Sequence, residues 1–523
     1  MKVLVEKKYM KVPLGFHAVN KKIYFHEGSK LVFDLDAAVD IVSPDYHEYV
    51  DVSRFIGKDI TVCCDMDLNY NFEFVNTPPA PDISDRFRPL VHFSSNSGWI
   101  NDPNGLVFSN GMYHMFFQHN TVGNKWGNMH WGHAVSSDLI HWTQKDEALY
   151  PDELGTMFSG SAIIDKDNVS DLGSNENPAM LLYYTAAGGT SKISEQKMFT
   201  QCLAYSTDNG ETFEKHEKNP IVPHIIDGNR DPKIIYCDEL KAYIMALYLT
   251  ENKYALLTSK DLVNWEQIDE FALNGDAECP DIYPLAVDGY AQNIKWVFSG
   301  ATDYYCVGSF KKGRFVPEGA PKRLHYGSAS YAAQTFSDTE ELGRRIRIAW
   351  NRTEIPSSRF NGSMAFPTDM TLKTINGEEY LCAMPIPEIE TLRKGEQKYL
   401  NEIAEKDNAF SAVLDGKAYD ISLDITANGV NFKISLFGLE FEFKVKENLM
   451  QVQNHSVPLF VDSGKIKLRI ITDIHGAEVF IDKGQAFICI GFIMDYNLNK
   501  LKLSSQNGDV QINEMKIFEL KEV

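Results

Sequence analysis

The sequence predicts an all-β protein: a five-bladed β-propeller followed by a C-terminal β-sandwich, with an additional small β module at the N-terminus. Three observations lead to this prediction. Aromatic residues make up 12% of the 523 residues, which favours strands over helices. A short turn element recurs in the middle of the chain, as in repeat-built folds. Apolar and polar residues alternate strictly in the C-terminal part, as in antiparallel strands with one buried face.

The N-terminal region contains short strand patterns and shows no helical periodicity. Residues 30–36 alternate in their second half, and residues 49–53 and 59–62 read as strands on either side of a glycine turn. We expect a small sandwich-like module over residues 1–84, ending in the proline-rich stretch 76–82. Its role is open between sugar binding, oligomerisation and bracing. No clear aromatic platform is visible, which favours bracing or oligomerisation.

The central region carries a recurring turn. Residues 137–142 (Ser-Asp-Leu-Ile-His-Trp) are matched by 260–265 (Lys-Asp-Leu-Val-Asn-Trp), and 206–213 is a looser copy ending in Phe. The aspartates of the copies are 70 and 53 residues apart. Recurrence at this scale without helices favours a propeller over residues 85–388, and about 50 to 70 residues per blade gives five blades. Each copy is expected to be a turn before an outer strand, with its aromatic residue packing between blades.

The C-terminal region reads as a sandwich. Residues 389–404 are polar and helix-compatible, and we expect a linker there. Strand patterns return over residues 405–523, where one face is apolar and the other polar. The clearest example alternates Tyr419, Ile421, Leu423 and Ile425 with polar residues.

The overall composition argues against some partners and indicates a cellular location. The formal net charge is −21, with 72 acidic and 51 basic residues spread along the chain, so nucleic acid is not expected as a partner. The eight cysteines are scattered without a Cys-x-x-Cys pair, which indicates free thiols in a reducing compartment. No signal-peptide pattern and no stretch of transmembrane length is visible, so we expect a cytoplasmic protein without a membrane partner. A secreted chain whose leader was removed would look the same.

The stretch 99–105 (Trp-Ile-Asn-Asp-Pro-Asn-Gly) is strong turn chemistry between two apolar segments. Taken alone it predicts a hairpin loop. Trp99 weakens that interpretation, because a large aromatic beside a tightly held carboxylate, here Asp102, is what a sugar site needs.

Two further carboxylates stand in unusual local sequence before strands. Cleavage of a glycosidic bond needs two carboxyl groups, and the inner strands of a propeller bring distant residues together at the central axis. Asp231 follows Arg230, which would keep the carboxylate ionised and suited to charge stabilisation, although a surface ion pair would read the same. Glu278 lies between Ala and Cys, a setting that raises a carboxyl pKa toward that of a useful acid. A strand-edge Glu is the plainer interpretation, and Asp281 is a rival proton donor.

Together, these three stretches resemble the motifs of glycoside hydrolase family 32, the β-fructofuranosidases, in the order that the family has them. The resemblance covers about residues 88–523. Further matching segments are 117–120 (Phe-Gln-His-Asn), 126–133 (Trp-Gly-Asn-Met-His-Trp-Gly-His), 158–162 (Phe-Ser-Gly-Ser-Ala), Tyr326-Gly327 and 331–334 (Tyr-Ala-Ala-Gln).

The resemblance implies a retaining double displacement on a β-linked fructosyl unit, without a metal or other cofactor. Asp102 would be the nucleophile, Glu278 the acid/base and Asp231 the stabiliser of the transition state. Retention implies that the carboxyl groups of Asp102 and Glu278 lie about 5 to 5.5 Å apart. The residues that the resemblance places around the fructosyl unit are Asn101, Gln118, Trp126, Ser159 and Arg230.

The resemblance implies a carbohydrate substrate, and the leading hypothesis is an exo-acting enzyme that removes terminal fructose from inulin, levan, fructo-oligosaccharides or sucrose. Departures from the family pattern at residues 350–370 leave rim contacts and chain-length preference open. A sucrose or sucrose-6-phosphate hydrolase and a fructosyltransferase share the same chemistry. Lys125 alone is weak support for a phosphate site. A non-catalytic fructan-binding protein and an inverting arabinose-specific glycosidase are the other classes. The N-terminal module and the sandwich are the surfaces that a homo-oligomer would use.

Overall fold

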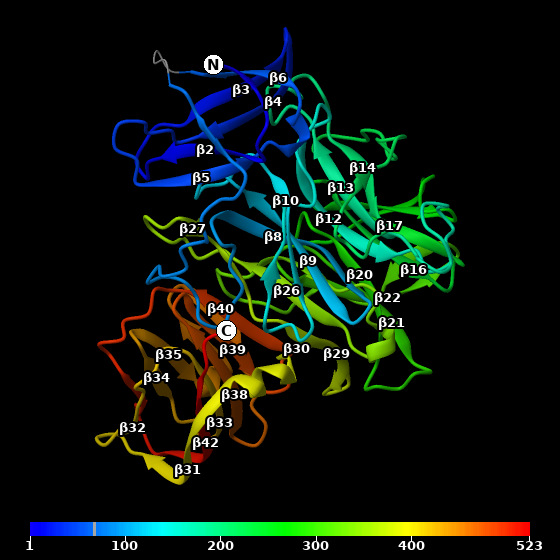
Figure 1. The fold of residues 1–523 in the computed structure, drawn as a ribbon. Helices are drawn as coiled ribbons and strands as arrows, with labels where there is room; N and C mark the ends of the chain where they lie inside the picture. The colour runs from blue at the N-terminus through cyan, green and yellow to red at the C-terminus, as the bar shows by residue number, and fades with distance from the viewer. Residues whose placement is uncertain (66–69) are drawn as a thin grey trace.

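The computed structural model describes residues 1–65 and 70–523 and confirms the all-β class. Figure 1 shows the N-terminal strands at the top, the central sheets in the middle and the C-terminal strands at the bottom. In the described residues, helical structure is limited to four short 3-10 turns: η1 (Ser53–Phe55), η2 (Glu340–Leu342), η3 (Pro387–Leu392) and η4 (Val445–Glu447). No helix in this part of the chain is long and apolar enough to cross a membrane.

The N-terminal residues form two antiparallel sheets. One sheet has the order β1 (Lys2–Leu4), β6 (Asp59–Cys64), β3 (Lys21–Glu27), β4 (Lys30–Ala37). The other has the order β5 (Tyr46–Asp51), β2 (Tyr9–Leu14), β7 (Glu73–Val75). Val12 and Phe33 belong to one apolar core that both sheets share. The strands expected from the sequence in this region correspond to β4, β5 and β6.

Five antiparallel sheets follow one another along the chain between residues 98 and 385. The first contains β8 (Gly98–Ser109), β9 (Met112–Asn120), β10 (His130–Ser136) and β11 (Thr143–Gln144). The second contains β12 (Thr156–Ile164), β13 (Met180–Ala187), β14 (Thr200–Ser206) and β15 (Glu214–Lys215). The third contains β16 (Arg230–Cys237), β17 (Ala242–Thr250), β18 (Lys253–Ser259) and β19 (Glu266–Ala272).

The last two of these sheets include short additional strands. The fourth contains β20 (Asp281–Ala286), β21 (Ile294–Ser299), β22 (Tyr304–Lys311), β23 (Arg314–Pro317) and β24 (Lys322–Arg323). The fifth contains β25 (Tyr331–Thr335), β26 (Ile346–Asn351), β28 (Ser363–Met364), β29 (Thr368–Ile375) and β30 (Glu378–Pro385). One short strand, β27 (Phe360–Asn361), leaves this region and pairs in parallel with β8 of the first sheet.

The first strands of these sheets lie side by side in a ring. β8 contacts β12, β12 contacts β16, β16 contacts β20, β20 contacts β25, and β25 returns to β8. Such a closed order of up-and-down sheets is that of a β-propeller. Its inner strands bring residues that are far apart in sequence to one central axis.

The recurring turn lies between the third and fourth strands of the first three sheets. In each copy the aspartate carboxylate accepts two backbone N–H bonds, as Asp138 does from Ile140 and His141. The aromatic residue of each later copy packs on a ring of the preceding sheet. The Phe213 and Phe116 centroids are 5.4 Å apart, and those of Trp265 and Tyr183 are 5.9 Å apart. These turns therefore pack one sheet against the next, as the sequence predicted.

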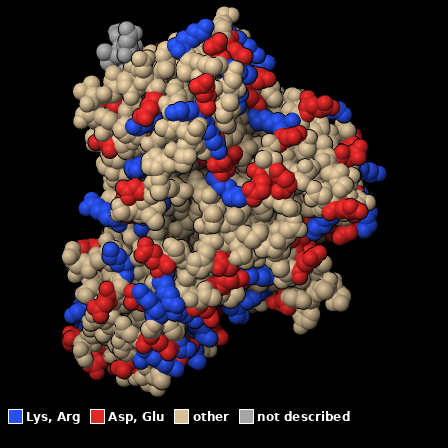
Figure 2. Space-filling view, in the orientation of Figure 1, with Lys and Arg blue, Asp and Glu red and all other residues tan. Residues whose placement is uncertain are grey.

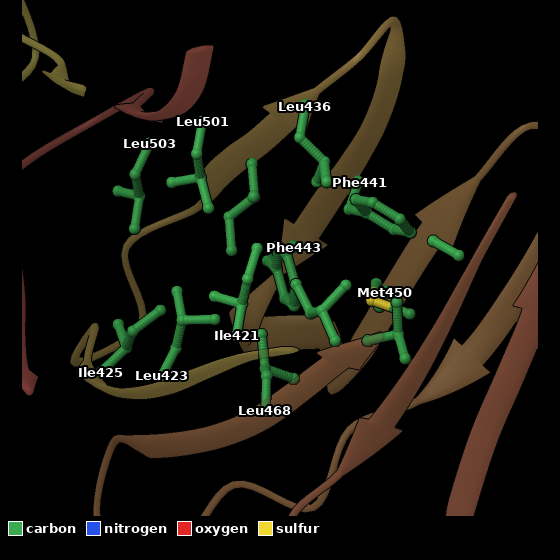
Figure 3. Close-up of a cluster of buried hydrophobic side chains, with 14 of the residues drawn as sticks. Ile421, Leu423, Ile425, Leu436, Phe441, Phe443, Met450, Leu468, Leu501 and Leu503 are labelled. Carbon is green, nitrogen blue, oxygen red and sulfur yellow. The ribbon is translucent and has the colours of Figure 1, made fainter. Parts of the chain in front are cut away.

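The C-terminal part is a sandwich of two six-stranded antiparallel sheets. One has the order β31 (Arg393–Ala404), β42 (Val510–Leu520), β33 (Tyr419–Thr426), β38 (Lys465–Asp473), β39 (Gly476–Ile481), β40 (Ala486–Gly491). The other has the order β32 (Phe410–Val413), β41 (Lys500–Ser505), β34 (Phe432–Leu436), β35 (Leu439–Lys444), β36 (Leu449–Val452), β37 (His455–Pro458). Figure 3 shows the alternating apolar residues, such as Ile421 and Leu423, pointing into the shared core.

The structure corrects the expectation of a helix-compatible linker over residues 389–404. Residues 393–404 form β31, which pairs with β42 along its whole length. β31 is an edge strand with most of its side chains exposed on both faces, so it lacks the alternation that identifies a half-buried strand. Only the short turn η3 precedes it.

A buried histidine joins the sandwich to the segment that leads into β8. His92 Nδ1 lies 2.8 Å from Asp473 Oδ2, and its Nε2 lies 3.1 Å from Glu478 Oε1. Asp473 also accepts the backbone N–H groups of Leu90 and Val91. Burial lowers the pKa of His92, but the hydrogen bonds and charges of the two carboxylates outweigh it and raise this pKa to about 10. The interface therefore holds a charged imidazolium.

The surface and the thiols agree with the sequence analysis. All eight cysteines are free, and six of them are buried. On the face drawn in Figure 2, acidic and basic side chains are interspersed. The expected cytoplasmic address stays a prediction.

Candidate active site

One pocket of about 350 Å³ contains every site residue that the sequence predicted. The three carboxylates in its lining are Asp102, Asp231 and Glu278. The other predicted residues in the lining are Asn101, Gln118, Trp126, Ser159 and Arg230. The remaining lining residues are Phe158, Phe199, Gly228, Tyr331 and Trp350.

The inner strands deliver these side chains through β-bulges. The register of β8 with β9 shifts between Ile100 and Pro103, where Asp102 lies. The register of β12 with β13 shifts at Ser159. The register of β16 with β17 shifts just after Arg230, at Asp231. A bulge places an extra residue in one strand and re-aims its side chain. Asp102, Ser159 and Asp231 can therefore all face the pocket although they start from three different strands.

Asp102 is held by short polar contacts on both oxygens. Ser159 Oγ donates to Oδ2 at 2.6 Å, and Asn101 Nδ2 donates to Oδ1 at 3.1 Å. Trp99 Nε1 donates to Asn101 Oδ1 at 2.9 Å and so fixes the orientation of that amide. Burial raises the pKa of Asp102, and the charge of Glu278 adds to this, while the hydrogen bonds from Ser159 and Asn101 act in the opposite direction. The net direction is upward from its ordinary value.

Asp231 lies in the left-handed region, with φ +65°, a conformation that costs energy for a non-glycine residue. Its Oδ2 accepts the backbone N–H of Cys279 at 3.0 Å, and its own N–H donates to Thr185 Oγ1 at 3.0 Å. Burial raises the pKa of Asp231 to about 7, because it outweighs the adjacent Arg230 and is reinforced by the other two carboxylates. Arg230, whose Nε lies 3.8 Å from Asp231 Oδ2, lowers this pKa in the direction expected from the sequence, but burial outweighs it.

Glu278 is in the loop before β20 and is also in the left-handed region, with φ +59°. Its Oε1 accepts a 2.5 Å hydrogen bond from Arg230 Nη2, and its Oε2 accepts one of 2.5 Å from the Tyr331 hydroxyl. Its side chain is 32% exposed, so it is reached from the pocket rather than enclosed in the apolar setting that its neighbours suggested.

The rival donor Asp281 lies elsewhere. It is 2% exposed, 3.3 Å from Lys233 Nζ, and accepts the Thr335 backbone N–H at 2.6 Å. This buried ion pair is not part of the pocket lining. The geometry therefore favours Glu278 over Asp281 as the second carboxyl group of the site.

Aromatic side chains form one side of the pocket, and we call Trp126, Phe158 and Phe199 the aromatic wall. The Trp126 and Phe158 rings meet edge to face at 5.9 Å, and Phe158 meets Phe199 in the same way at 5.5 Å. Trp126 is 56% exposed, an unusual state for so large an apolar ring. The wall therefore offers an apolar face to whatever extends out of the pocket.

Sequence reasoning missed four contributors to the site. Tyr331 and Cys279 belong to motifs that resemble the family, and Trp350 belongs to the segment that departs from it. The hydrogen bond of Tyr331 with Glu278 and the contact of Cys279 Sγ with Asp102 at 3.6 Å appear only in the folded structure. Phe199 had no sequence signal. No cluster of three or more His, Cys, Asp or Glu in residues 1–65 and 70–523 is arranged to hold a metal ion.

Comparison with known families and structures agrees with this geometry. The sequence profile described as "Glycosyl hydrolases family 32 N-terminal domain" matches residues 92–385. The chain belongs to glycoside hydrolase family 32.

Relatives of this family 32 member match along most of their lengths. It is 32% identical over 494 residues to a levanase of Bacillus subtilis, covering 84% of this chain and 71% of the levanase. It is 27% identical to an extracellular exo-inulinase of Aspergillus awamori, covering 89% of this chain and 98% of the inulinase. The crystal structure of exo-inulinase from Aspergillus awamori superposes with a TM-score of 0.76 at 25% identity, covering 84% of this chain and 99% of that one.

Proposed function

We propose that this protein is a retaining, exo-acting β-fructosidase that releases terminal β-D-fructosyl units from fructans, fructo-oligosaccharides or sucrose. The observation that carries the proposal is the meeting of Asp102, Asp231 and Glu278 in one pocket. Glycosidic hydrolysis needs two carboxyl groups on opposite sides of the scissile bond, and the third is available to the sugar hydroxyls. The names of the relatives, levanase and exo-inulinase, support a fructan as the substrate class.

In the first step, the Asp102 carboxylate attacks the anomeric carbon of the fructosyl unit, and the bond to the leaving oxygen breaks. The hydrogen bonds from Ser159 and Asn101 orient the carboxylate and favour its ionised form. The proton that the leaving oxygen needs comes from Glu278. A covalent fructosyl-enzyme results, as in retaining glycosidases.

In the second step, Glu278 acts as a base. Having lost its proton, the Glu278 carboxylate is stabilised by Arg230 and by the Tyr331 hydroxyl, the arrangement that the structure displays. It takes a proton from an incoming water, and that water attacks the anomeric carbon and frees Asp102. The same two contacts thus stabilise the carboxylate that the second step requires.

Asp231 stabilises the positively charged transition state and binds hydroxyls of the fructosyl ring. Burial raises the pKa values of Asp102 and Asp231, and repulsion among the carboxylates of the pocket adds to this rise. Positive charge that develops on the sugar between them relieves this repulsion. Stabilisation is therefore greater in the transition state than in the ground state, which is the requirement for catalysis.

We propose that the five sheets between residues 85 and 388 are the five blades of the propeller. Residues 1–84 form the N-terminal module, and the sandwich begins with β31 at Arg393. Supporting this division, each sheet contributes its first strand to the central ring, and β27 links the last sheet to the first.

The experiment is a product profile. The protein is incubated with levan, inulin and sucrose, and products are separated over time. The proposal expects fructose as the first and dominant product, without intermediate oligosaccharides from the polymers. Early appearance of oligosaccharides would contradict exo action, and absence of fructose from all three substrates would refute the proposed function.

A further inference from the structure

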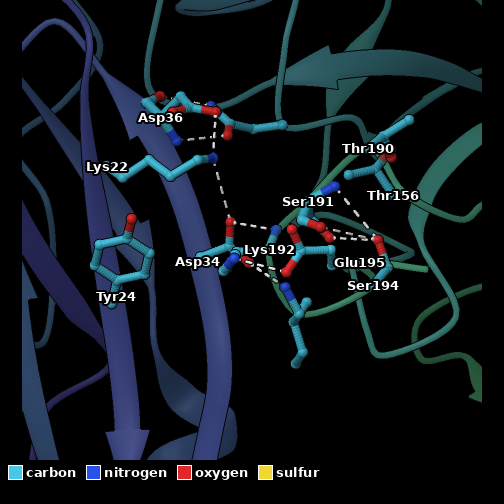
Figure 4. Close-up of polar contacts among 12 residues, drawn as sticks. Lys22, Tyr24, Asp34, Asp36, Thr156, Thr190, Ser191, Lys192, Ser194 and Glu195 are labelled. Carbon is cyan, nitrogen blue, oxygen red and sulfur yellow. Dashed lines mark hydrogen bonds and ion pairs between the residues drawn. The ribbon is translucent and has the colours of Figure 1, made fainter. Parts of the chain in front are cut away.

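Strand β4 brings the N-terminal module close to the active-site pocket. It is the edge strand of its sheet, and its residues Asp34 and Asp36 form hydrogen bonds with loops of the central sheets. Two loops of the central sheets meet it: residues 121–128, which carry Trp126, and residues 188–197, which lead into Phe199. Figure 4 shows Asp34 of β4 beside Lys192 of the second loop, with the Lys22 side chain reaching both Asp34 and Asp36.

Asp34 binds the second loop. Its two carboxylate oxygens accept the backbone N–H groups of Lys192 and Ile193, each at 2.9 Å. The Asp34 side chain is only 1% exposed, and Lys22 Nζ lies 3.5 Å from it. A buried carboxylate that accepts two N–H bonds fixes the turn to which they belong. Asp34 of the N-terminal module therefore fixes the backbone conformation of the loop over residues 188–197.

Asp36 binds the first loop through its backbone. Its N–H donates to Asn128 Oδ1 at 2.8 Å, and its carbonyl accepts from Asn128 Nδ2 at 2.7 Å. Asn128 thereby pairs with the edge strand as a neighbouring strand would. Val122, in the same loop, is 1% exposed and belongs to the apolar core of the N-terminal module. The loop that carries Trp126 is thus anchored in the module by two independent contacts.

Both loops end in the aromatic wall. Trp126 comes from the first loop and Phe199 follows the second, and the two rings flank Phe158, which extends from β12. β4 therefore contacts the loops of both outer members of the wall. The three catalytic carboxylates are held separately, by the inner strands and the loop before β20.

We propose that β4 of the N-terminal module, through Asp34 and Asp36, positions the aromatic wall and thereby sets how the sugar unit beyond the first fructosyl residue is bound. This inference rests on the proposed function. The wall lines the pocket, and its Trp126 is more than half exposed, so the part of a substrate that protrudes from the pocket must pass over it. Asp34, Asp36 and Asn128 are positioning residues in this scheme. The bracing role that the sequence favours for the N-terminal module would thus affect which substrates the pocket binds.

The test compares a short and a long substrate in Asp34→Ala. Methyl β-D-fructofuranoside has a leaving group too small to lie on the wall, whereas a fructo-oligosaccharide has further sugar units to place there. For the oligosaccharide, KM should rise about three- to tenfold, the factor that matches the loss of about 0.5 to 1.5 kcal/mol of aromatic contact. The kcat/KM for the methyl fructoside should stay within about twofold of wild type, because the carboxylates are held elsewhere.

A matched control is available inside the module. Asp40 also accepts two backbone N–H bonds, from Val42 and Ser43 at 3.0 Å each, but within its own module. Asp40→Ala should leave both substrates unchanged. Asn128→Asp acts on the other loop and replaces the amide that donates to the Asp36 carbonyl and to Asn120 Oδ1 with an acceptor. It should reproduce the selective effect even where Asp34→Ala fails to fold.

The outcomes separate the two proposals. Equal loss on both substrates, or no change on either, would overturn the positioning role while leaving the proposed function intact. A wild-type protein that cleaves neither substrate would overturn the proposed function itself. A selective rise in KM for the longer substrate in both variants, with Asp40→Ala unchanged, supports the inference.

Discussion

Asp231 in the pocket and Asp473 at the sandwich interface are both fully buried carboxylates, yet their pKa values move in opposite directions. Asp473 accepts the N–H groups of Leu90 and Val91 and pairs with His92, and these contacts hold its pKa below the ordinary value despite burial. Asp231 has Arg230 and one backbone N–H, but burial outweighs them, the two other carboxylates of the pocket add to its effect, and the pKa of Asp231 rises to about 7.

The difference teaches which buried charges serve stability and which serve chemistry. At the interface, opposite charges meet and favour the folded state. In the pocket, like charges are brought together by bulges and left-handed backbone, both of which cost energy. Catalytic centres commonly hold like charges close together, and their repulsion is relieved when positive charge develops on the sugar. Four predictions break or sharpen this comparison, and they are given in order of expected effect.

The largest effect is expected from removing the reacting carboxylates. Asp102→Asn and Glu278→Gln should each lower kcat for fructose release by about 10³-fold or more, because nucleophilic attack and proton transfer are both lost. Initial rates on sucrose or inulin measure this. Glu211→Gln, a change at an exposed surface carboxylate, is the control and should keep the full rate. Full activity in either pocket variant would remove the basis of the mechanism.

The next effect concerns the interface. His92→Gln should lower the free energy of unfolding by about 3 to 5 kcal/mol, since it leaves Asp473 and Glu478 buried without their cation. The pKa of His92 is raised from 6.5 to about 10 in the folded state, so its contribution is fully present below about pH 6.5 and is lost as the pH rises toward 10. Thermal unfolding of both proteins from pH 6 to 10 should show the difference shrinking. A constant difference would mean that His92 acts by packing alone.

A smaller effect of opposite sign is expected from Asp231→Asn. The folded-state pKa of Asp231 is raised from 3.8 to about 7, so its ionised form costs stability above about pH 4, and the full cost is reached above pH 7. The variant should therefore unfold at a temperature a few degrees higher at pH 7.5, with no gain at pH 4, while fructose release falls. If the variant is less stable at pH 7.5, the crowding of the three carboxylates is not what the comparison claims.

The smallest effect is expected from Tyr331→Phe. Loss of one hydrogen bond to Glu278 should lower kcat/KM by about 5- to 30-fold, the equivalent of about 1 to 2 kcal/mol. Tyr331 donates this bond to Glu278 Oε2, so the loss should appear in the initial rates on sucrose or inulin. An unchanged kcat/KM would show that the hydrogen bond has no part in the reaction.

Much of the site could be predicted from the sequence because its carboxylates stand in local signals. Asn-Pro-Gly turn chemistry marks Asp102, and short motifs before strands mark Asp231 and Glu278. Recurring aspartate turns indicated the propeller because each copy makes the same local hydrogen bonds, as at Asp138. These features depend on neighbouring residues, which a sequence displays directly.

What could not be predicted depends on residues that are distant in sequence or on exposure. Phe199 and the contact of Asp34 with Lys192 arise only when separate parts of the chain pack together. The raised pKa of Asp231 reflects burial that no local pattern reveals. β31 was mistaken for a linker because an exposed edge strand has no periodic apolar face.

Product stereochemistry tests the central claim most directly. Wild-type protein is incubated with sucrose or inulin in dilute methanol, and the first methyl fructoside formed is identified by NMR. Attack by Asp102 followed by a second displacement predicts methyl β-D-fructofuranoside, with the configuration of the substrate retained. Formation of the α anomer would contradict the double displacement and require a wider separation of the two carboxyl groups, about 6.5 to 9.5 Å.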